Sequence, residues 1–279
     1  MNTVATNRAT LRRWYDKMWA ECDSGLVPKI AGQTYLRHDI TGANNAMTSE
    51  QYGEMVGIGT TDSTVIDFSY CLIAQDNYVG SIGRMMFEGD RQWDWVQLFR
   101  LEDGKMVETW LPGMGGTDPF GFPQAWSVWQ GGEIPPALPE SSRQTCVREF
   151  LQQRWVDNKP ETLDQFVGDY IVVHDTDKAG QQLTRQGYND VIAAQLATRD
   201  VADLQLFMLE EDNLIIAVAS WQVNGDKQWD FTQAFRFDGN LIVETWLPSI
   251  GGTDDTLSLG PHSRWPDGVI PETVYRPKP

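Results

Sequence analysis

The sequence predicts an α+β protein built from two tandem copies of one fold, packed together as a pseudo-dimer. The stretch WDWVQLFRLEDGKMVETWLPGMGGTD at 93–118 returns as WDFTQAFRFDGNLIVETWLPSIGGTD at 229–254, an offset of 229 − 93 = 136. This offset holds without a gap from about residue 10 to 135, and such a long register indicates a duplicated domain. In each copy helical patterns precede a series of strand patterns, which is typical of α+β domains.

The two expected domains cover residues 1–139 and 140–279. Their boundary is expected in PALPESSR at 136–143, where prolines and small polar residues replace the regular patterns. Each domain ends in a tail rich in Gly, Pro and Trp, and these tails are expected to wrap over the neighbouring copy or to close a cavity mouth.

Each copy begins with a predicted helix, because apolar side chains recur there at helical spacing. A short strand and a second helix follow, and the second copy has one extra short helix. The predicted helices are 9–22 and 48–57 in the first copy and 144–157, 161–167 and 184–197 in the second; the short strands are 34–39 and 170–175.

Four longer strands follow in each copy, and hairpin turns such as Asp103-Gly104 and Asn224-Gly225 separate them. The strands are predicted at 64–75, 78–87, 92–101 and 105–111, and again at 201–211, 214–223, 228–237 and 241–247. A meander of this kind predicts an antiparallel sheet that curls around the helices.

The composition excludes several classes of partner. The formal net charge is −17, which argues against nucleic acid and anionic membranes as partners, since both require basic patches. No apolar run is long enough to span a membrane. The three cysteines share no repeat positions and indicate no disulfide framework, so a reducing cytoplasm is the expected location.

Two motifs resemble a known family. FRLEDGKMVETW at 99–110 and FRFDGNLIVETW at 235–246 resemble the signature of SnoaL-like proteins, which belong to the nuclear transport factor 2-like and ketosteroid isomerase-like superfamily. TYLRHD at 34–39 resembles the family's early strand with its histidine. The resemblance covers about residues 10–111 and 146–247, and it implies two cone-shaped, curved antiparallel sheets, each around a cavity. That fold hosts cyclases, isomerases, dehydratases, hydrolases and binding proteins without activity.

The sequence departs from the family pattern at two polar positions. Members with cyclase-type chemistry usually have an Asp three residues before the signature Arg, where this chain has Gln97 and Gln233. An amide cannot accept a proton as a general base. The family's common E-H-W-D ending reads Glu-Thr-Trp-Leu in both copies.

Strand alternation predicts the ligand-binding face. It places aromatic side chains and one amide on the same side of the third long strand, a combination that suits a flat, apolar ligand. The alternative is a solid core between sheet and helix. The candidates are Trp93, Trp95, Gln97 and Phe99, then Trp229, Phe231, Gln233 and Phe235, together with Tyr52 and Tyr188 on the second helices. Arg84 aligns with Ser220, so an Arg84 in the first cavity would favour an anionic ligand in that copy alone.

His38 and His174 are the candidate proton shuttles, since the pKa of histidine lies near neutrality. Glu108 and Glu244 are their candidate partners, because a carboxylate in a dry pocket can act as acid or base. The alternatives are structural histidines bonded to the backbone, and glutamates paired with arginines on the outer face. One His and one Asp per copy are too few for a metal site.

Two functions follow as hypotheses. The first is a cofactor-independent enzyme, an isomerase or lyase, that cyclises, isomerises or dehydrates a small polyketide- or terpenoid-like molecule by proton transfer. In it Gln97 or Gln233 would polarise a carbonyl. The second is a small-molecule binding protein without catalysis, which the amides at 97 and 233 favour. A further homodimer of the whole chain is compatible with either.

Overall fold

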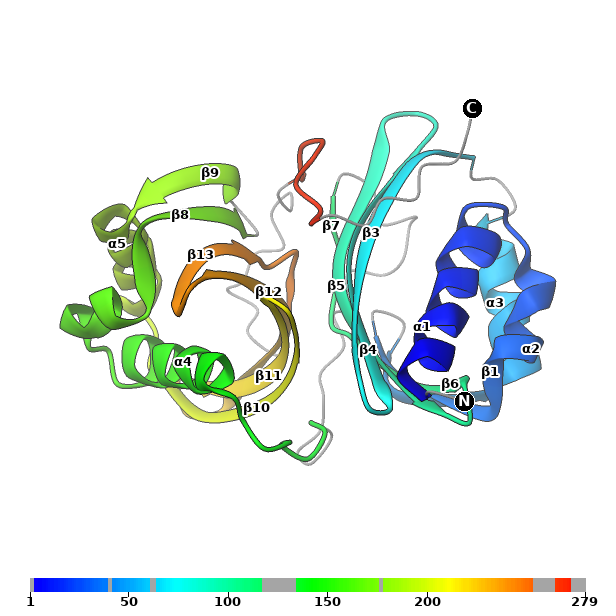
Figure 1. Cartoon of the computed structure of the whole chain (residues 1–279), viewed down its shortest axis with the longest axis horizontal. Coiled ribbons are helices and arrows are strands. Elements are labelled where there is room, and N and C mark those ends of the chain that lie inside the picture. The colour runs from blue at the N-terminus through cyan, green and yellow to red at the C-terminus, as the bar shows by residue number, and fades with distance from the viewer. Residues whose placement is uncertain are drawn as a thin grey trace.

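The computed structural model describes residues 3–39, 42–60, 64–116, 134–175, 178–252 and 264–271, and it contains two α+β halves side by side (Figure 1). In the first half, helices pack inside a curved sheet. Its helices are α1 (Thr3–Arg13), α2 (Val27–Ile30) and α3 (Ser49–Thr60), and its strands are β1 (Ala31–Asp39), β2 (Gly42–Thr48), β3 (Val65–Gln75), β4 (Tyr78–Phe87), β5 (Arg91–Glu102), β6 (Lys105–Leu111) and β7 (Gly115–Gly116).

The second half repeats this order of elements. Its helices are α4 (Ser142–Phe150) and α5 (Arg185–Leu196), and its strands are β8 (Val167–Asp175), β9 (Lys178–Thr184), β10 (Val201–Glu211), β11 (Leu214–Val223), β12 (Lys227–Asp238), β13 (Leu241–Trp246) and β14 (Ile250–Gly252). Helix α4 begins with a capping box, in which Ser141 and Gln144 bond each other's backbone N–H. The expected short helix is a 3-10 turn at Pro160–Gln165.

The first helix of each copy ends in a π-helical stretch, Trp14–Trp19 and Leu151–Val156. The ordinary helical spacing that predicts helices at 9–22 and 144–157 does not indicate this irregularity. A π-bulge often lies at a functional site, because the wider turn redirects side chains. Here the first of these stretches supplies three aromatic side chains to one hollow.

The two sheets have the same strand order, β2-β1-β6-β5-β4-β3 and β9-β8-β13-β12-β11-β10. The long strands are antiparallel neighbours as predicted. The expectation of a wholly antiparallel sheet needs one correction, because β1 pairs with β6, and β8 with β13, in parallel. Strands β2 and β9 were also missed. Their sequences, GANNAMT and KAGQQLT, lack the alternating apolar residues by which a strand is predicted, and each strand lies at one edge of its sheet.

The two halves meet through the outer faces of their sheets, which pack against each other in the middle of the molecule (Figure 1). The contact lies on a pseudo-two-fold axis, since residues at equivalent repeat positions touch. Thr232 donates its hydroxyl to the carbonyl of Val96 at 2.5 Å. Ile216 fills the space that a Cβ on its counterpart Gly80 would need. The predicted pseudo-dimer is therefore present, with complementary rather than identical contacts across the axis.

The segment 264–271 of the second copy crosses to the first. Trp265 is fully buried, and its backbone N–H donates to Asp94 at 2.9 Å while its indole donates to the carbonyl of His174 at 3.1 Å. This part of the second tail wraps over the neighbouring copy, as expected. Most of the first tail, with Trp126 and Trp129, lies outside the described residues.

Candidate functional site

The candidate site of the first copy is a hollow between its helices and the inner face of its sheet. It has an empty volume of about 730 Å³, including its open mouth. It is lined by Trp14, Tyr15, Trp19, Arg37, Asp39, Tyr52, Met55, Val56, Met85, Trp93, Trp95, Gln97, Leu111 and Met114.

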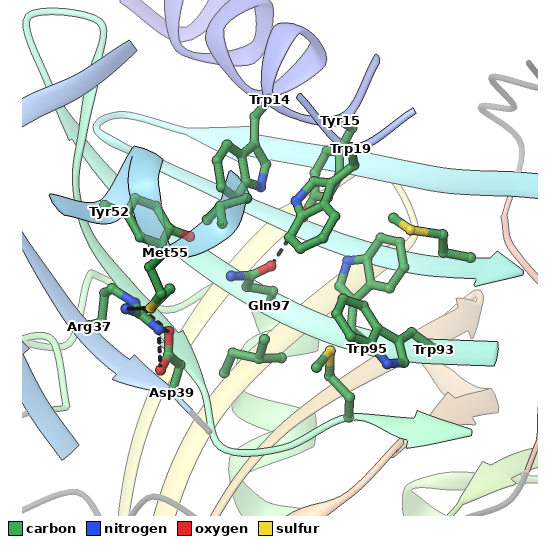
Figure 2. A pocket seen from close by; sticks show the side chains of 14 residues that line it. Trp14, Tyr15, Trp19, Arg37, Asp39, Tyr52, Met55, Trp93, Trp95 and Gln97 are labelled. Atoms are coloured by element: carbon green, nitrogen blue, oxygen red, sulfur yellow. Dashed lines mark hydrogen bonds and ion pairs between the residues drawn. The ribbon is translucent and has the colours of Figure 1, made fainter. Parts of the chain in front are cut away.

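Six of the 14 lining residues are aromatic, and their rings come from three directions (Figure 2). The Tyr15 ring stacks on Trp95 with centroids 5.6 Å apart and planes at 19°. Trp19 meets Trp93 edge-on at 5.4 Å, and Trp14 stacks on Tyr52 at 5.6 Å. Rings that hold one another in this way present preformed apolar surfaces to a ligand.

Gln97 lies at the centre of this wall, and both ends of its amide are already hydrogen-bonded. Its Nε2 donates to Thr109 Oγ1 at 3.0 Å, and its Oε1 accepts from the Tyr15 hydroxyl at 3.2 Å. Tyr15 also lies 2.6 Å from Ser81 Oγ, and burial raises the pKa of this phenol well above its usual range. The amide is therefore held in one orientation by neutral partners.

An ion pair closes one end of the hollow (Figure 2). Arg37 donates to both carboxylate oxygens of Asp39, at 2.6 Å and 2.8 Å, and its guanidinium lies 4.8 Å from the centre of the Tyr52 ring. Burial would lower the pKa of Arg37, but Asp39 and the tyrosines outweigh it and the pKa is raised. Sequence reasoning missed this pair, although the alternation in RHD at 37–39 puts both residues on one face.

The second copy has a matching hollow, with an empty volume of about 700 Å³ including its mouth. Its wall keeps the amide, since Gln233 donates to Thr245 Oγ1 at 2.6 Å. Three polar residues in or behind the first wall have apolar counterparts in the second copy: Leu151 replaces Tyr15, Ala217 replaces Ser81 and Val173 replaces Arg37. The lining residues are Trp155, Asp175, Tyr188, Val191, Ile192, Gln195, Trp221, Trp229, Phe231, Gln233, Leu247 and Ile250.

The candidate ligand-binding residues divide into two groups. Tyr52, Trp93, Trp95 and Gln97 line the first hollow, and Tyr188, Trp229, Phe231 and Gln233 line the second. Phe99 and Phe235 are fully buried in the two cores and line neither. On the inner face of β5 and β12, one part of each strand therefore lines the hollow and the following part packs in the core.

The candidate catalytic pairs form, but on the other face of the sheet. His38 Nε2 lies 2.9 Å from Glu108 Oε1, and the imidazole stacks on Trp110 in the core between the halves. His174 and Glu244 repeat this pair at 2.7 Å, against Trp246. The expectation that these residues act inside the cavities needs correction, because Arg37 and Asp39 occupy the inward positions of β1.

Glu108 differs from the expected carboxylate in a dry pocket. Burial would raise its pKa, but hydrogen bonds from His38 and from Arg100 at 2.7 Å outweigh burial, and the pKa is lowered. Glu108 is therefore held as a carboxylate. The alternative prediction, in which the glutamate pairs with an arginine on the outer face of the sheet, is correct for Glu108 and Arg100.

Arg84 is also absent from the first cavity. It forms ion pairs with Asp67 and Asp267, both at 2.8 Å, and donates to the carbonyl of Trp265 at 3.0 Å. Arg84 thus anchors the crossing segment of the second copy. An anionic ligand in the first cavity would not meet this charge.

Two general features bear on chemistry. Among the described residues, no three His, Cys, Asp or Glu side chains gather as a metal site would require. No helix in the described part of the chain is long and apolar enough to cross a membrane.

The chain matches no protein-family model and no curated protein sequence. In structure it is similar to a candidate polyketide cyclase from Acidithiobacillus ferrooxidans, at 15% identity and a TM-score of 0.36, over 42% of this chain and 92% of that one. It is also similar to a SnoaL-like polyketide cyclase from Agrobacterium tumefaciens (15% identity, TM-score 0.33, 40% and 92% covered). A third is an NTF2-like protein from Cytophaga hutchinsonii (8% identity, TM-score 0.28, 38% and 93% covered). Each of these proteins corresponds in length to about one half of this chain.

Proposed function

We propose that this protein binds small, flat, largely apolar molecules in the two hollows enclosed by its curved sheets. The observation that carries the proposal is the first hollow itself, whose wall consists mainly of interlocked aromatic rings and methionines. Tryptophan and tyrosine offer large rigid faces at little conformational cost, and such surfaces suit planar ligands. Ligand binding is therefore the first function that we propose for this chain.

The polar groups of the first hollow support binding rather than reaction. The amide of Gln97 is paired at both ends, and the carboxylate of Asp39 is paired with the guanidinium of Arg37. Because both groups are already engaged, a positioning role is favoured over proton exchange with a ligand. Their contribution would be to hold the wall rigid and to orient one polar group of the ligand.

Proton-transfer catalysis is a second candidate, favoured by one observation. The carboxylates Asp39 and Asp175 lie at equivalent repeat positions and line both hollows. A carboxylate facing a bound carbonyl compound can act as a general base, so cyclisation, isomerisation or dehydration of a polyketide- or terpenoid-like molecule would fall to these residues. Turnover that survives the double replacement Asp39→Asn, Asp175→Asn would refute this role.

Binding is tested by isothermal titration calorimetry with 1-naphthol, a flat molecule with one hydroxyl group. We expect saturable binding that weakens about tenfold in Trp93→Ala, because a stacking wall of the first hollow is lost. Tyr170→Ala removes an aromatic ring that is 58% exposed outside the hollows, and serves as the matched control. Absence of saturable binding in the wild type, or equal affinity in Trp93→Ala and Tyr170→Ala, would contradict the proposal.

A further inference from the structure

We infer that the second hollow selects a neutral planar ligand bearing a hydrogen-bond donor next to an acceptor, such as a cyclic amide, whereas the first does not. The inference rests on the proposed function and specifies it for one site. It comes from comparing the hydrogen bonds of the two walls at equivalent positions. In the first wall the amide, the phenol and the ion pair are held by hydrogen bonds, although the Trp14 indole N–H has no partner among the described residues. In the second wall two indole N–H groups lack a partner within the same residues, and the repeated amide is bonded there only through its nitrogen.

The difference begins at the repeated glutamine. In the first hollow Gln97 Oε1 accepts from the Tyr15 hydroxyl, and Ser81 holds that hydroxyl in place. In the second hollow Leu151 and Ala217 stand at those two positions, so neither hydroxyl exists. Gln233 is 5% exposed and uses its Nε2 for Thr245, while none of the described residues donates to its Oε1. An acceptor oxygen therefore faces the second hollow.

The second wall also contains two buried donors. Trp221 and Trp229 line the hollow and are 4% and 2% exposed, and within the described residues neither indole N–H has a hydrogen-bond partner. Their counterparts in the first copy are Met85, which has no donor, and Trp93. A buried donor without a partner costs roughly 1–3 kcal/mol, so a ligand acceptor that displaces the apolar atoms covering an indole N–H recovers part of this cost.

The wall of the second hollow thus combines the Gln233 oxygen and the Asp175 carboxylate as acceptors, two indole donors and aromatic faces from Trp155 and Phe231. A planar amide matches this set, because its N–H can donate to Gln233 and its C=O can accept from an indole. A binding site strongly rejects a ligand that leaves one of the site's buried polar groups without a hydrogen-bond partner. Apolar contacts distinguish weakly between ligands of similar shape. The preference for an amide should therefore be measurable even for small probes.

The probes are 2-quinolone and coumarin, which have the same bicyclic shape and the same carbonyl group. At the ring position next to the carbonyl, 2-quinolone has an N–H group and coumarin has an oxygen atom. Calorimetry on the wild type should give at least tenfold tighter binding of 2-quinolone. Gln233→Met removes the acceptor and should abolish the preference, while Gln186→Met on the exposed side of α5 (Arg185–Leu196) is the matched control. Trp229→Phe should weaken both probes. Equal affinity of the two probes for the wild type, or an unchanged preference in Gln233→Met, would overturn the inference.

A variant that gains a binding preference is also useful, because misfolding could explain a loss of binding but not a gain. Tyr15→Phe keeps the ring but removes the hydroxyl from Gln97 Oε1, so the first hollow acquires an open acceptor. In the Gln233→Met background, which has lost the preference, we expect Tyr15→Phe to restore tighter binding of 2-quinolone than of coumarin, and equal affinity of the two probes there would count against the inference. Binding of 1-naphthol separates the two proposals: if it persists while the amide preference is absent, only this inference fails.

Discussion

Gly83 determines whether the aromatic wall of the first hollow can exist. A Cβ added there would lie 2.0 Å from Cζ2 and 2.3 Å from Cε2 of Trp95. Ordinary contacts begin at 3.4 Å, so the indole would have to move by about 1.4 Å. We predict that Gly83→Ala lowers the free energy of unfolding by about 1–3 kcal/mol, as overpacking of a core does. It should also weaken 1-naphthol binding, because the displaced ring is part of the wall.

The second copy contains the compensating pair. The counterparts of Gly83 and Trp95 are Ala219 and Phe231, so the position with a methyl group faces the smaller ring. Transplanting this pair into the first copy, as Gly83→Ala with Trp95→Phe, should recover most of the stability lost in Gly83→Ala. Contacting residues typically show coupling energies of about 0.5–3 kcal/mol, and we expect a coupling in this range that favours the double variant.

The assay is urea unfolding of the wild type, both single variants and the double variant, followed by tryptophan fluorescence and circular dichroism. The variant Gly225→Ala is not a suitable control, because Gly225 has a φ of +84°. A better control is Gly187→Ala, where a Cβ would lie 3.3 Å from the Thr184 hydroxyl oxygen and 3.9 Å from Leu183 Cβ. Additive single effects, or a Gly83→Ala variant as stable as the wild type, would refute the reasoning.

Two further predictions concern the outer faces. Burial raises the pKa of Asp94 from 3.8 to about 7, so the folded state favours the protonated carboxyl group. The contribution of Asp94 to the free energy of unfolding is therefore fully present below pH 4 and is lost as the pH rises through about 7. The free energy of unfolding should fall over this range by up to about 4 kcal/mol relative to Asp94→Asn, and parallel pH profiles in urea unfolding would contradict this. His38→Leu removes a donor from Glu108 and should lower the free energy of unfolding by about 1–3 kcal/mol without changing 1-naphthol affinity. Lost binding at unchanged stability would place His38 in the site after all.

Much of the fold could be read from the sequence because its information is local and repeated. The 136-residue offset identified two copies, and the turn residues separated the long strands nearly where they begin and end. Alternation along β5 correctly grouped Trp93, Trp95 and Gln97 on one face. These features depend on the backbone's two-residue period and on turn chemistry, which act between near neighbours.

The sequence by itself thus determined the duplication, the element types and which side chains share a strand face. Only the tertiary structure decided which face looks into the hollow. Both faces of these sheets are buried, one under the helices and the other against the second copy, so burial patterns along β1 could not separate Arg37 from His38. Contacts such as Arg84 with Trp265, 181 residues apart, arise only when the two copies dock, because no local pattern encodes a partner so distant in the chain.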